Sequence, residues 1–390
     1  MRILHTSDWH LGRSFGPISL ANDQQAFIDW MIGQCAAQSI ELVVIAGDIF
    51  DRAVAPTESV VMFRGALRRL QAAEITVAVI TGNHDGADRV FAYDDLLDRC
   101  GVLIRGGYSK IGEVLSVTFT DGPLDLVMLP FLDPQSAPDD LPLTAHEPET
   151  DAFERRRRRT HQSVLEAAIA AARPNVTSPR SLAIAHAFVA GAAASDSERQ
   201  LSIGGTGTVD ASLFSEFSYT ALGHLHRPQV VSANGNVRYS GTPLAYSFSE
   251  DHPKSVTIID MAPDGACSIE TVPIPVGRPV ATIRGTMDEL LGAGPSAHVV
   301  GSLVRAVVTD RGVVLDARQR LSAVYPHVVE IVLDPPLAAG ATAGAAIDRR
   351  QVSATQAADA FWVASVGSEP SDDERVVLHE AIAEAEAKVA

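Results

Sequence analysis

The sequence predicts an α/β protein of two or three domains, and three observations support this prediction. Short apolar runs alternate with helical patterns through the first hundred residues, which is typical of βαβ units around a parallel sheet. Two later pairs of apolar runs flank Asn234-Gly235 and Pro263-Asp264-Gly265, and such turn sequences predict β-hairpins. The length of 390 residues allows two or three domains, each with a buried core.

The first third of the chain supplies the expected parallel strands. We predict strands at Ile3–Thr6, Leu42–Ala46 and Thr76–Ile80, separated by helices at Ala21–Gln38 and Thr57–Ala73. Leu42–Ala46 is apolar at every position, so we expect this strand to be buried on both faces.

The pattern changes to more strands and fewer helices between about residues 101 and 275. Strands are predicted at Val114–Phe119 and Leu124–Leu129, and shorter ones at Leu182–Ala185 and Tyr219–Leu222. A long helix is predicted over Asp151–Ala172.

Proline-rich and linker-like stretches later in the chain predict further domains. The Pro-rich stretch Val272–Pro279 indicates a boundary, so we expect a main domain at 1–275 and a small α/β domain at 276–335. Residues 336–390 then form a linker and a C-terminal helix, Asp372–Val389. The apolar side of that helix contains Val376, Val377, Leu378, Ala381, Ile382 and Ala385.

Composition excludes several classes of protein. With 31 Lys+Arg against 48 Asp+Glu, the net charge of -17 argues against a protein that coats nucleic acid by bulk electrostatics. It still permits a nuclease whose site is made positive by metal ions. Three scattered cysteines exclude a disulfide framework and a cysteine zinc site. We see no signal peptide and no apolar run long enough for a membrane span, and we expect a cytoplasmic, nucleoid-associated protein.

Five short segments concentrate carboxylate, amide and imidazole groups, and each closely follows a predicted strand. Because ligands bind at the carboxyl ends of strands in open α/β sheets, we expect these segments to meet in one cleft. The segments are Asp8-Trp9-His10, Gly47–Asp51, Gly82–Asp85, Ala185-His186-Ala187 and Gly223–His226.

The residue types in these segments predict a site for two metal ions. Imidazole with carboxylate, and no thiolate, favours Mn, Fe or Zn. Asp48 follows a glycine, which leaves its carboxylate able to bridge two ions. Two ions about 3.5–4 Å apart can bind both oxygens of a phosphodiester and activate water near neutral pH. The seven candidate ligands are Asp8, His10, Asp48, Asn83, His186, His224 and His226.

Each segment alone has a structural explanation. A strand-end Asp8 is commonly a turn former, Gly82–Asp85 a tight turn, and His186 a hydrogen-bonded core histidine. Taken together, these structural explanations are less convincing than a metal site, because five of the twelve histidines fall in the five segments.

The order of these segments resembles the calcineurin-like metallophosphoesterase superfamily. Ser7–Gly12, Ala46–Asp51, Thr81–Asp85 and Leu222–His226 are similar to one branch in particular, the nuclease subunits of bacterial complexes with an ATPase. This resemblance implies a β-sandwich flanked by helices (α/β/β/α), a small α/β capping domain and a C-terminal helical tail.

The resemblance also implies a role for each site residue. Asp48 would bridge the two ions, and His84 would be the general acid or stabilise the leaving 3′-oxygen. Asp85 would orient His84. Asp51 stands where some relatives carry a second active-site histidine, and we expect it to support a ligand. One ion would be held by Asp8, His10 and His226, and the other by Asn83, His186 and His224.

The function that the resemblance implies is a manganese-dependent DNA nuclease. It would be a 3′–5′ exonuclease and an endonuclease on DNA ends and hairpins, acting in DNA repair and recombination with its ATPase as a homodimer within a heterotetramer. The tail helix would dock on the coiled-coil base of that ATPase, the alternative being that it packs on its own chain. Two other functions remain open: a small-molecule phosphodiesterase or phosphatase of the same fold, and a non-catalytic scaffold for the ATPase.

Two basic features are candidates for DNA contact. Arg13 lies beside the first segment and could meet a phosphate, the alternative being an ion pair with an acidic neighbour. For the run Arg155–Arg159, a solvated surface is favoured over contact with the DNA backbone, because successive guanidinium groups on a helix point in different directions.

Overall fold

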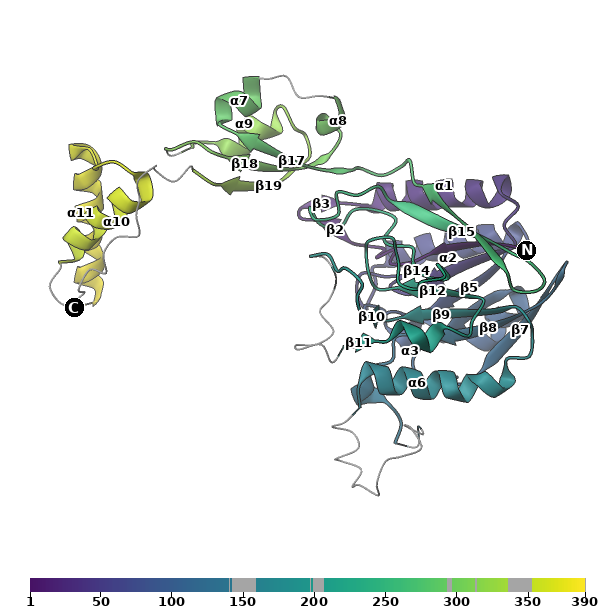
Figure 1. Cartoon of the computed structure of the whole chain (residues 1–390). Helices are drawn as coiled ribbons and strands as arrows, with labels where there is room; N and C mark the ends of the chain where they lie inside the picture. Colours follow the sequence, from purple (N-terminus) through teal and green to yellow (C-terminus); the bar gives the residue numbers. More distant parts are fainter. Residues whose placement is uncertain are drawn as a thin grey trace. The chain divides into compact units, whose positions relative to one another are not determined.

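The computed structural model describes residues 1–139, 141, 159–196, 198, 207–292, 297–312, 314–335 and 353–389. The chain separates into two compact units, Met1–Ala281 and Thr282–Ala390 (Figure 1). Among the helices of these residues, none combines the length and apolar character that a membrane span requires.

The first unit contains two six-stranded sheets of similar design. Each sheet has four adjacent parallel strands. In the first sheet these are β1, β4, β5 and β6, which reach one edge, and the antiparallel pairs β1–β15 and β15–β16 complete the other side. The first sheet runs in the order β16 (Cys267–Pro273), β15 (Ser255–Met261), β1 (Arg2–Thr6), β4 (Leu42–Ala46), β5 (Thr76–Ile80) and β6 (Val102–Arg105).

The second sheet, built from later strands, has an antiparallel strand at both edges. Its parallel centre is β14-β12-β9-β8, with β13 antiparallel to β14 and β7 antiparallel to β8. The order is β13 (Gln229–Val230), β14 (Val237–Tyr239), β12 (Tyr219–Gly223), β9 (Ser181–His186), β8 (Gly122–Leu129) and β7 (Val114–Phe119). The two predicted hairpins, β13–β14 and β15–β16, are therefore confirmed.

Three apolar clusters show that the sheets pack face to face between helices. Alternate residues of β4 divide between two clusters: Val44 packs in the core shared with β8, β9 and β12, and Val43 packs against the helices. This explains why the strand is apolar at every position. Helices α1 (Ala21–Ala37) and α2 (Thr57–Ala72) cover the first sheet, and α6 (His161–Ala172) covers the second (Figure 1). The layers are α/β/β/α, as expected.

Short elements complete this unit. They are the strands β2 (Ser14–Phe15), β3 (Ile18–Ser19), β10 (Phe188–Val189) and β11 (Thr208–Val209), the helices α3 (Ala87–Val90) and α4 (Asp94–Leu97), and the 3-10 turns Asp98–Cys100, Pro134–Ser136, Arg173–Asn175 and Ala211–Phe214.

The helix predicted over Asp151–Ala172 begins later than expected. Thr160 occupies the N-cap, and its side chain accepts a hydrogen bond from the Ser163 backbone, so α6 starts at His161. Arg159 lies before the cap and is buried, with its guanidinium donating to the carbonyl oxygens of Ala137 and Pro138. Arg159 therefore has a structural role, and Arg155–Arg158 lie outside the described residues.

The second unit begins with a three-stranded sheet in the order β17-β18-β19. Its apolar core contains Met287, Leu321 and Tyr325. The sequence predicts a strand over Val299–Val308, but Val299 and Val300 belong to the short helix α8, and the strand begins at Leu303. The elements are β17 (Val280–Gly285), α7 (Met287–Gly292), α8 (Ala297–Val300), β18 (Leu303–Val308), α9 (Ala317–Ser322) and β19 (Val328–Leu333).

The chain ends in a helical hairpin of α10 (Ala354–Val366) and α11 (Asp372–Val389), and the predicted tail helix is confirmed at its predicted bounds. Asp359 of α10 lies 3.0 Å from the ring nitrogen Nε2 of His379 on α11. Phe361 and Val377 expose 73% and 67% of their surfaces, so this hairpin leaves large apolar side chains uncovered by the described residues.

Candidate metal centre

The candidate ligands follow five strand ends, three in the first sheet and two in the second. Asp8, Asp48 and Asn83 follow β1, β4 and β5, while His186 ends β9 and His224 follows β12. Among the seven candidate ligands, positive φ angles occur at Asp8 (53°), His10 (44°), Asp48 (49°) and His224 (106°). Such strained backbone is typical of functional sites, where surrounding bonds maintain it.

Two glycines allow the strand ends to approach closely. A Cβ atom on Gly82 would lie 2.1 Å from Asp48 Oδ1. A Cβ atom on Gly223 would lie 1.8 Å from the carbonyl oxygen of Ala46, which belongs to the other sheet. A side chain at either position would therefore push the candidate ligands apart.

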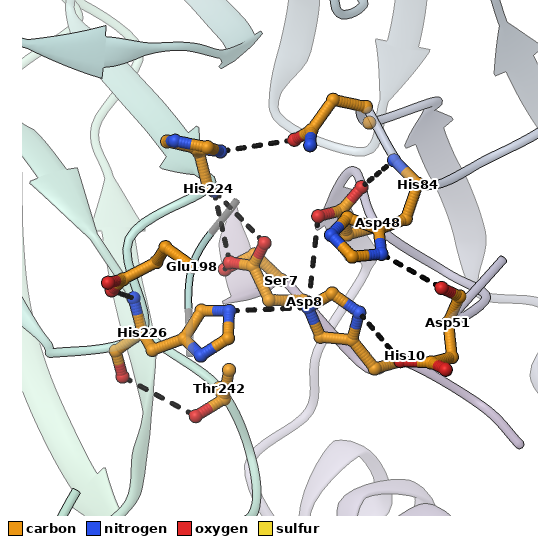
Figure 2. A network of polar contacts seen from close by, with 12 residues as sticks. Ser7, Asp8, His10, Asp48, Asp51, His84, Glu198, His224, His226 and Thr242 are labelled. Atoms are coloured by element: carbon orange, nitrogen blue, oxygen red, sulfur yellow. Dashed lines mark hydrogen bonds and ion pairs between the residues drawn. The ribbon is translucent and has the colours of Figure 1, made fainter. Parts of the chain in front are cut away.

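One group of ligands gathers around Asp8. The ligand atoms of Asp8, His10 and His226 all lie within 4.8 Å of one another. The Nε2 atoms of His10 and His226 face each other at 3.3 Å. Figure 2 shows these two rings turned toward each other beside the Asp8 carboxylate.

A second group gathers around Asn83. Its side-chain oxygen Oδ1 lies 2.9 Å from His186 Nε2 and 3.1 Å from His224 Nδ1. Asp48 lies between the two groups, since its Oδ2 atom is 3.7 Å from His10 Nε2 and 3.6 Å from His186 Nε2. The structure thus brings together all seven residues that were predicted from the sequence as metal ligands.

The electrostatics of these residues fit divalent cations. Burial lowers the pKa of His10, His186 and His224, which leaves these imidazoles neutral with a lone pair available. Burial, followed by the nearby charge of Asp48, raises the pKa of Asp8. Carboxylates crowded together away from water, beside neutral imidazoles, are an environment that a cation stabilises. Oxygen and imidazole donors without thiolate suit Mn, Fe or Zn.

His84 lies at the edge of this group. Like Asn83 it is half-buried, whereas the other six candidate ligands are buried. Its ring nitrogen Nδ1 is 2.8 Å from the carbonyl oxygen of Asp51, so Nδ1 carries a proton and donates it to that oxygen. Its backbone N–H donates to Asp48 Oδ1 at 2.8 Å. The His84 ring is therefore held beside the candidate ligands with Nε2 as its second polar atom.

Comparisons with known proteins agree with this geometry. The profile of the calcineurin-like phosphoesterase family matches residues 1–163. The SbcD subunit of the nuclease SbcCD from Bacillus subtilis is 35% identical over 298 residues, which cover 72% of this chain and 71% of that protein. The chain belongs to the calcineurin-like phosphoesterases, in the family of the SbcD nuclease subunits.

Two further relatives are SbcD subunits as well. The Escherichia coli K12 protein is 28% identical over 74% of this chain and 72% of its own length. The Staphylococcus epidermidis protein is 26% identical over 85% of each chain. Family membership makes this chain a phosphoesterase, and the names of its relatives place it among nucleases.

The structure corrects the expected role of Asp85. Its carboxylate accepts hydrogen bonds from the backbone N–H groups of Gly82, Ile49 and Phe50, at 2.8–3.1 Å, so it joins the loops after β5 and β4. The hydrogen bond of the His84 ring is made to the Asp51 carbonyl oxygen and not to the Asp85 carboxylate. Burial, followed by the charge of Asp48, raises the pKa of Asp85 to about 7.

Asp51 and Arg13 form a pair beside His10. Asp51 Oδ1 lies 4.0 Å from His10 Nδ1 and 3.6 Å from Arg13 Nη1. The Arg13 guanidinium also lies over the Tyr246 ring, 5.0 Å from its centre. The Asp51 carboxylate therefore lies beside a candidate ligand, and Arg13 forms the ion pair that was the alternative to a phosphate contact.

The sequence interpretation missed several residues that contact the candidate ligands, among them two glutamates and a tyrosine. Glu198 accepts a hydrogen bond from the His226 backbone N–H at 2.7 Å, and Glu250 Oε1 lies 3.1 Å from His226 Nδ1. The Tyr246 ring packs edge-on against His10. These residues lie outside the five segments, and the one signal was the spacing of Glu250 and Lys254, four residues apart.

Burial alone would raise the pKa of the Glu250 carboxyl. The hydrogen bond with His226 and the charge of Lys254 outweigh this effect and lower that pKa well below its usual range. Glu250 is therefore an anion buried directly behind a candidate ligand.

Proposed function

We propose that this chain is a metal-dependent DNA nuclease, a 3′–5′ exonuclease and endonuclease on DNA ends and hairpins. It would act with an SbcC-type ATPase in DNA repair and recombination, in the cytoplasm where the nucleoid lies. The observation that carries the proposal is the convergence of seven nitrogen and oxygen donors on one buried site. The relatives, which are SbcD subunits of SbcCD nucleases, give the class of substrate.

We assign the ligands to two ions, most suitably Mn²⁺. Asp8, His10 and His226 would hold one ion, and Asn83, His186 and His224 the other. The central position of Asp48, less than 4 Å from an imidazole of each set, supports its role as the bridge. Two such ions supply the Lewis acidity that activates water and offsets the charge of the phosphodiester.

The protein's own contribution to bond cleavage is centred on His84. Because Nδ1–H is held by the Asp51 carbonyl, the protonated ring would present Nε2–H to the leaving 3′-oxygen as a general acid. The Asp48 carboxylate fixes the same residue through its backbone N–H. Asp51 thus places His84 through its carbonyl, and its carboxylate stands behind His10.

The acidic composition of the chain supports the proposal that a partner protein provides most of the DNA binding. A net charge of -17 predicts weak, salt-sensitive binding of DNA by this chain alone. We assign the SbcC-type ATPase to this task, in a heterotetramer built on a homodimer of this chain. Residues 276–335 would cap the DNA over the site, and the exposed Phe361 and Val377 suit docking on the ATPase.

Deleting residues 370–390 tests the docking proposal. Loss of SbcC binding in a pull-down, with Mn²⁺-dependent activity on single strands retained, would support it. Retained binding would contradict it.

One assay separates the nuclease from a small-molecule esterase. Hydrolysis of linear DNA, a DNA hairpin and a chromogenic phosphodiester is measured with Mn²⁺ and with Mg²⁺. We expect cleavage of both DNAs and greater activity with Mn²⁺. Hydrolysis of the chromogenic ester alone would favour the small-molecule enzyme, and no hydrolysis of any substrate would favour a scaffold.

A further inference from the structure

The Glu250 carboxylate is buried directly behind the His226 ring. Only 1% of Glu250 is exposed, and its Oε1 atom lies 3.1 Å from His226 Nδ1. A carboxylate can only accept a hydrogen bond at this distance, so the Nδ1 atom must carry the proton. A neutral ring protonated at Nδ1 has its lone pair on Nε2.

The Nε2 atom faces the place where a metal would bind. It is the His226 atom that lies 3.3 Å from His10 Nε2, in the group that also contains Asp8. The hydrogen bond to Glu250 therefore selects the tautomer that can ligate on the Asp8 side. The opposite tautomer would aim an N–H group at the ion and could not bind it.

Two neighbours hold Glu250 in this orientation. Its Oε2 atom accepts hydrogen bonds from Thr242 Oγ1 at 3.0 Å and from Lys254 Nζ at 2.5 Å. The Thr242 backbone N–H in turn donates to the His226 carbonyl at 3.1 Å. The carboxylate is thus tied both to the backbone of His226 and to its ring, so the ring has one preferred orientation.

Lys254 also balances the buried charge. Its side chain is 10% exposed, and its ammonium group lies against both Glu250 Oε2 and Thr242 Oγ1. Without this cation the carboxylate would be an uncompensated buried charge, which is strongly unfavourable.

Two other candidate imidazoles are oriented differently. His186 Nδ1 lies 2.9 Å from the main-chain carbonyl of Ala46, and His10 Nδ1 is 4.0 Å from Asp51 Oδ1. His226 differs from both, because a carboxylate oxygen lies within hydrogen-bonding distance of its ring. A full negative charge behind an imidazole also makes it a stronger donor to a cation.

We propose that Glu250, held by Lys254 and Thr242, is a positioning residue that sets the tautomer and orientation of His226 for metal binding. The proposal rests on the metal centre described above and adds a residue outside the five motif segments. Its consequence is that metal affinity depends on a carboxylate 24 residues from the ligand it orients.

The direct test is the tautomer of His226 in the full-length, metal-free protein. Histidine ¹⁵N spectra of the wild type, assigned with His226→Asn and recorded over a pH series that includes the neutral ring, should show the neutral His226 ring protonated at Nδ1. A wild-type ring protonated at Nε2 would overturn the proposal without any variant of Glu250.

A second test uses Glu250→Gln, which keeps the shape of the side chain and removes its charge. Calorimetric titration with Mn²⁺ alone should show affinity reduced by about 10–100-fold, the usual effect of losing the partner of a metal-ligating histidine. The His226 spectrum should change as well. Glu216→Gln removes a glutamate from an exposed ion pair with Arg173 and should change neither measurement.

The results separate this proposal from the proposed function. A folded Glu250→Gln protein with wild-type Mn²⁺ affinity and an unchanged His226 tautomer would overturn the role of Glu250 and leave the nuclease intact. A wild-type protein that binds no Mn²⁺ and cleaves no DNA would overturn the proposed function, whatever the tautomer of His226.

Discussion

The two sheets make different contributions to the candidate site. The first sheet supplies every oxygen donor, Asp8, Asp48 and Asn83, together with His10. The second sheet supplies imidazoles, those of His186, His224 and His226. The negative charge among the seven candidate ligands therefore comes from the first sheet, and the second sheet adds directional nitrogen ligands without charge.

This difference matters because each sheet orients the ligands of the other. The His224 backbone N–H donates to Asp8 Oδ1 at 3.0 Å, and His186 Nδ1 is held 2.9 Å from the Ala46 carbonyl. Neither sheet alone could assemble the site, since these contacts exist only across the sandwich. Changes that remove charge from the first sheet should thus affect catalysis most, and changes at the junction should affect geometry and stability.

The largest effect is expected from Asp48→Asn. The variant keeps the side-chain oxygen that accepts from the His84 backbone but removes the charge placed between the two ligand groups. Hydrolysis of DNA with Mn²⁺ should be abolished, while circular dichroism should show an unchanged fold. Asp29→Asn, in an exposed ion pair with Arg69, is the control and should keep full activity. Substantial activity in the Asp48 variant would contradict its bridging role.

A smaller effect is expected from His84→Gln, which removes a proton donor and leaves the seven ligands unchanged. Turnover should fall by about 10²–10⁴-fold, the usual contribution of a general acid. Metal content, measured by elemental analysis, should remain that of the wild type. Loss of metal instead would identify His84 as a ligand.

The junction of the sheets is tested by Gly223→Ala. Its added Cβ atom would meet the Ala46 carbonyl oxygen at 1.8 Å, so we expect destabilisation of about 1–3 kcal/mol from overpacking. Urea unfolding measures this loss, and Mn²⁺ binding should weaken with it. The matched control is Gly33→Ala, where no atom lies within 4 Å, and helix α1 should gain about 0.5–1 kcal/mol. A Gly223 variant as stable as the wild type would show that the sheets can separate locally.

The smallest effect concerns His5, which joins β1 to Tyr219 and to the Leu222 carbonyl of β12 at 3.0 and 3.1 Å. Burial lowers the pKa of His5 to about 3. The unfolded chain takes up this proton below pH 6.5 and the folded chain does not, so stability falls as the pH drops from about 6.5 toward 3. One such proton changes stability by at most about 1.4 kcal/mol per pH unit.

Urea unfolding between about pH 7 and pH 5 measures this dependence. The wild type should lose stability more steeply than His5→Gln, which can still hydrogen-bond to both partners but does not titrate. Equal slopes in the two proteins would show that His5 is not protonated differently on unfolding.

Most of the site could be predicted from the sequence because its ligands follow strands in short segments. Asp8, Asp48 and Asn83 come directly after apolar runs, and their strands lie side by side in the first sheet. Glu250 could not be predicted, since it lies in a loop outside the five segments, and its spacing from Lys254 does not indicate contact with His226. The role of Asp85 was wrong because adjacency in the chain does not imply contact: its carboxylate turns toward the loop after β4.

The fold shows the same limit. The alternating strands and helices predicted both sheets, but the start of α6 was placed too early. The decisive signal was local, the reciprocal hydrogen bonds between Thr160 and Ser163 at the N-cap. In the second unit, Val299 and Val300 are apolar residues in a short helix, and apolar runs of that length do not distinguish helix from strand.

The central claim is that the two sheets together hold a pair of divalent ions. Equilibrium dialysis of the full-length protein against Mn²⁺, with the bound metal counted by elemental analysis, tests it most directly. The account predicts two ions per chain in the wild type. A wild-type protein that saturates with a single ion, or binds none, would contradict it.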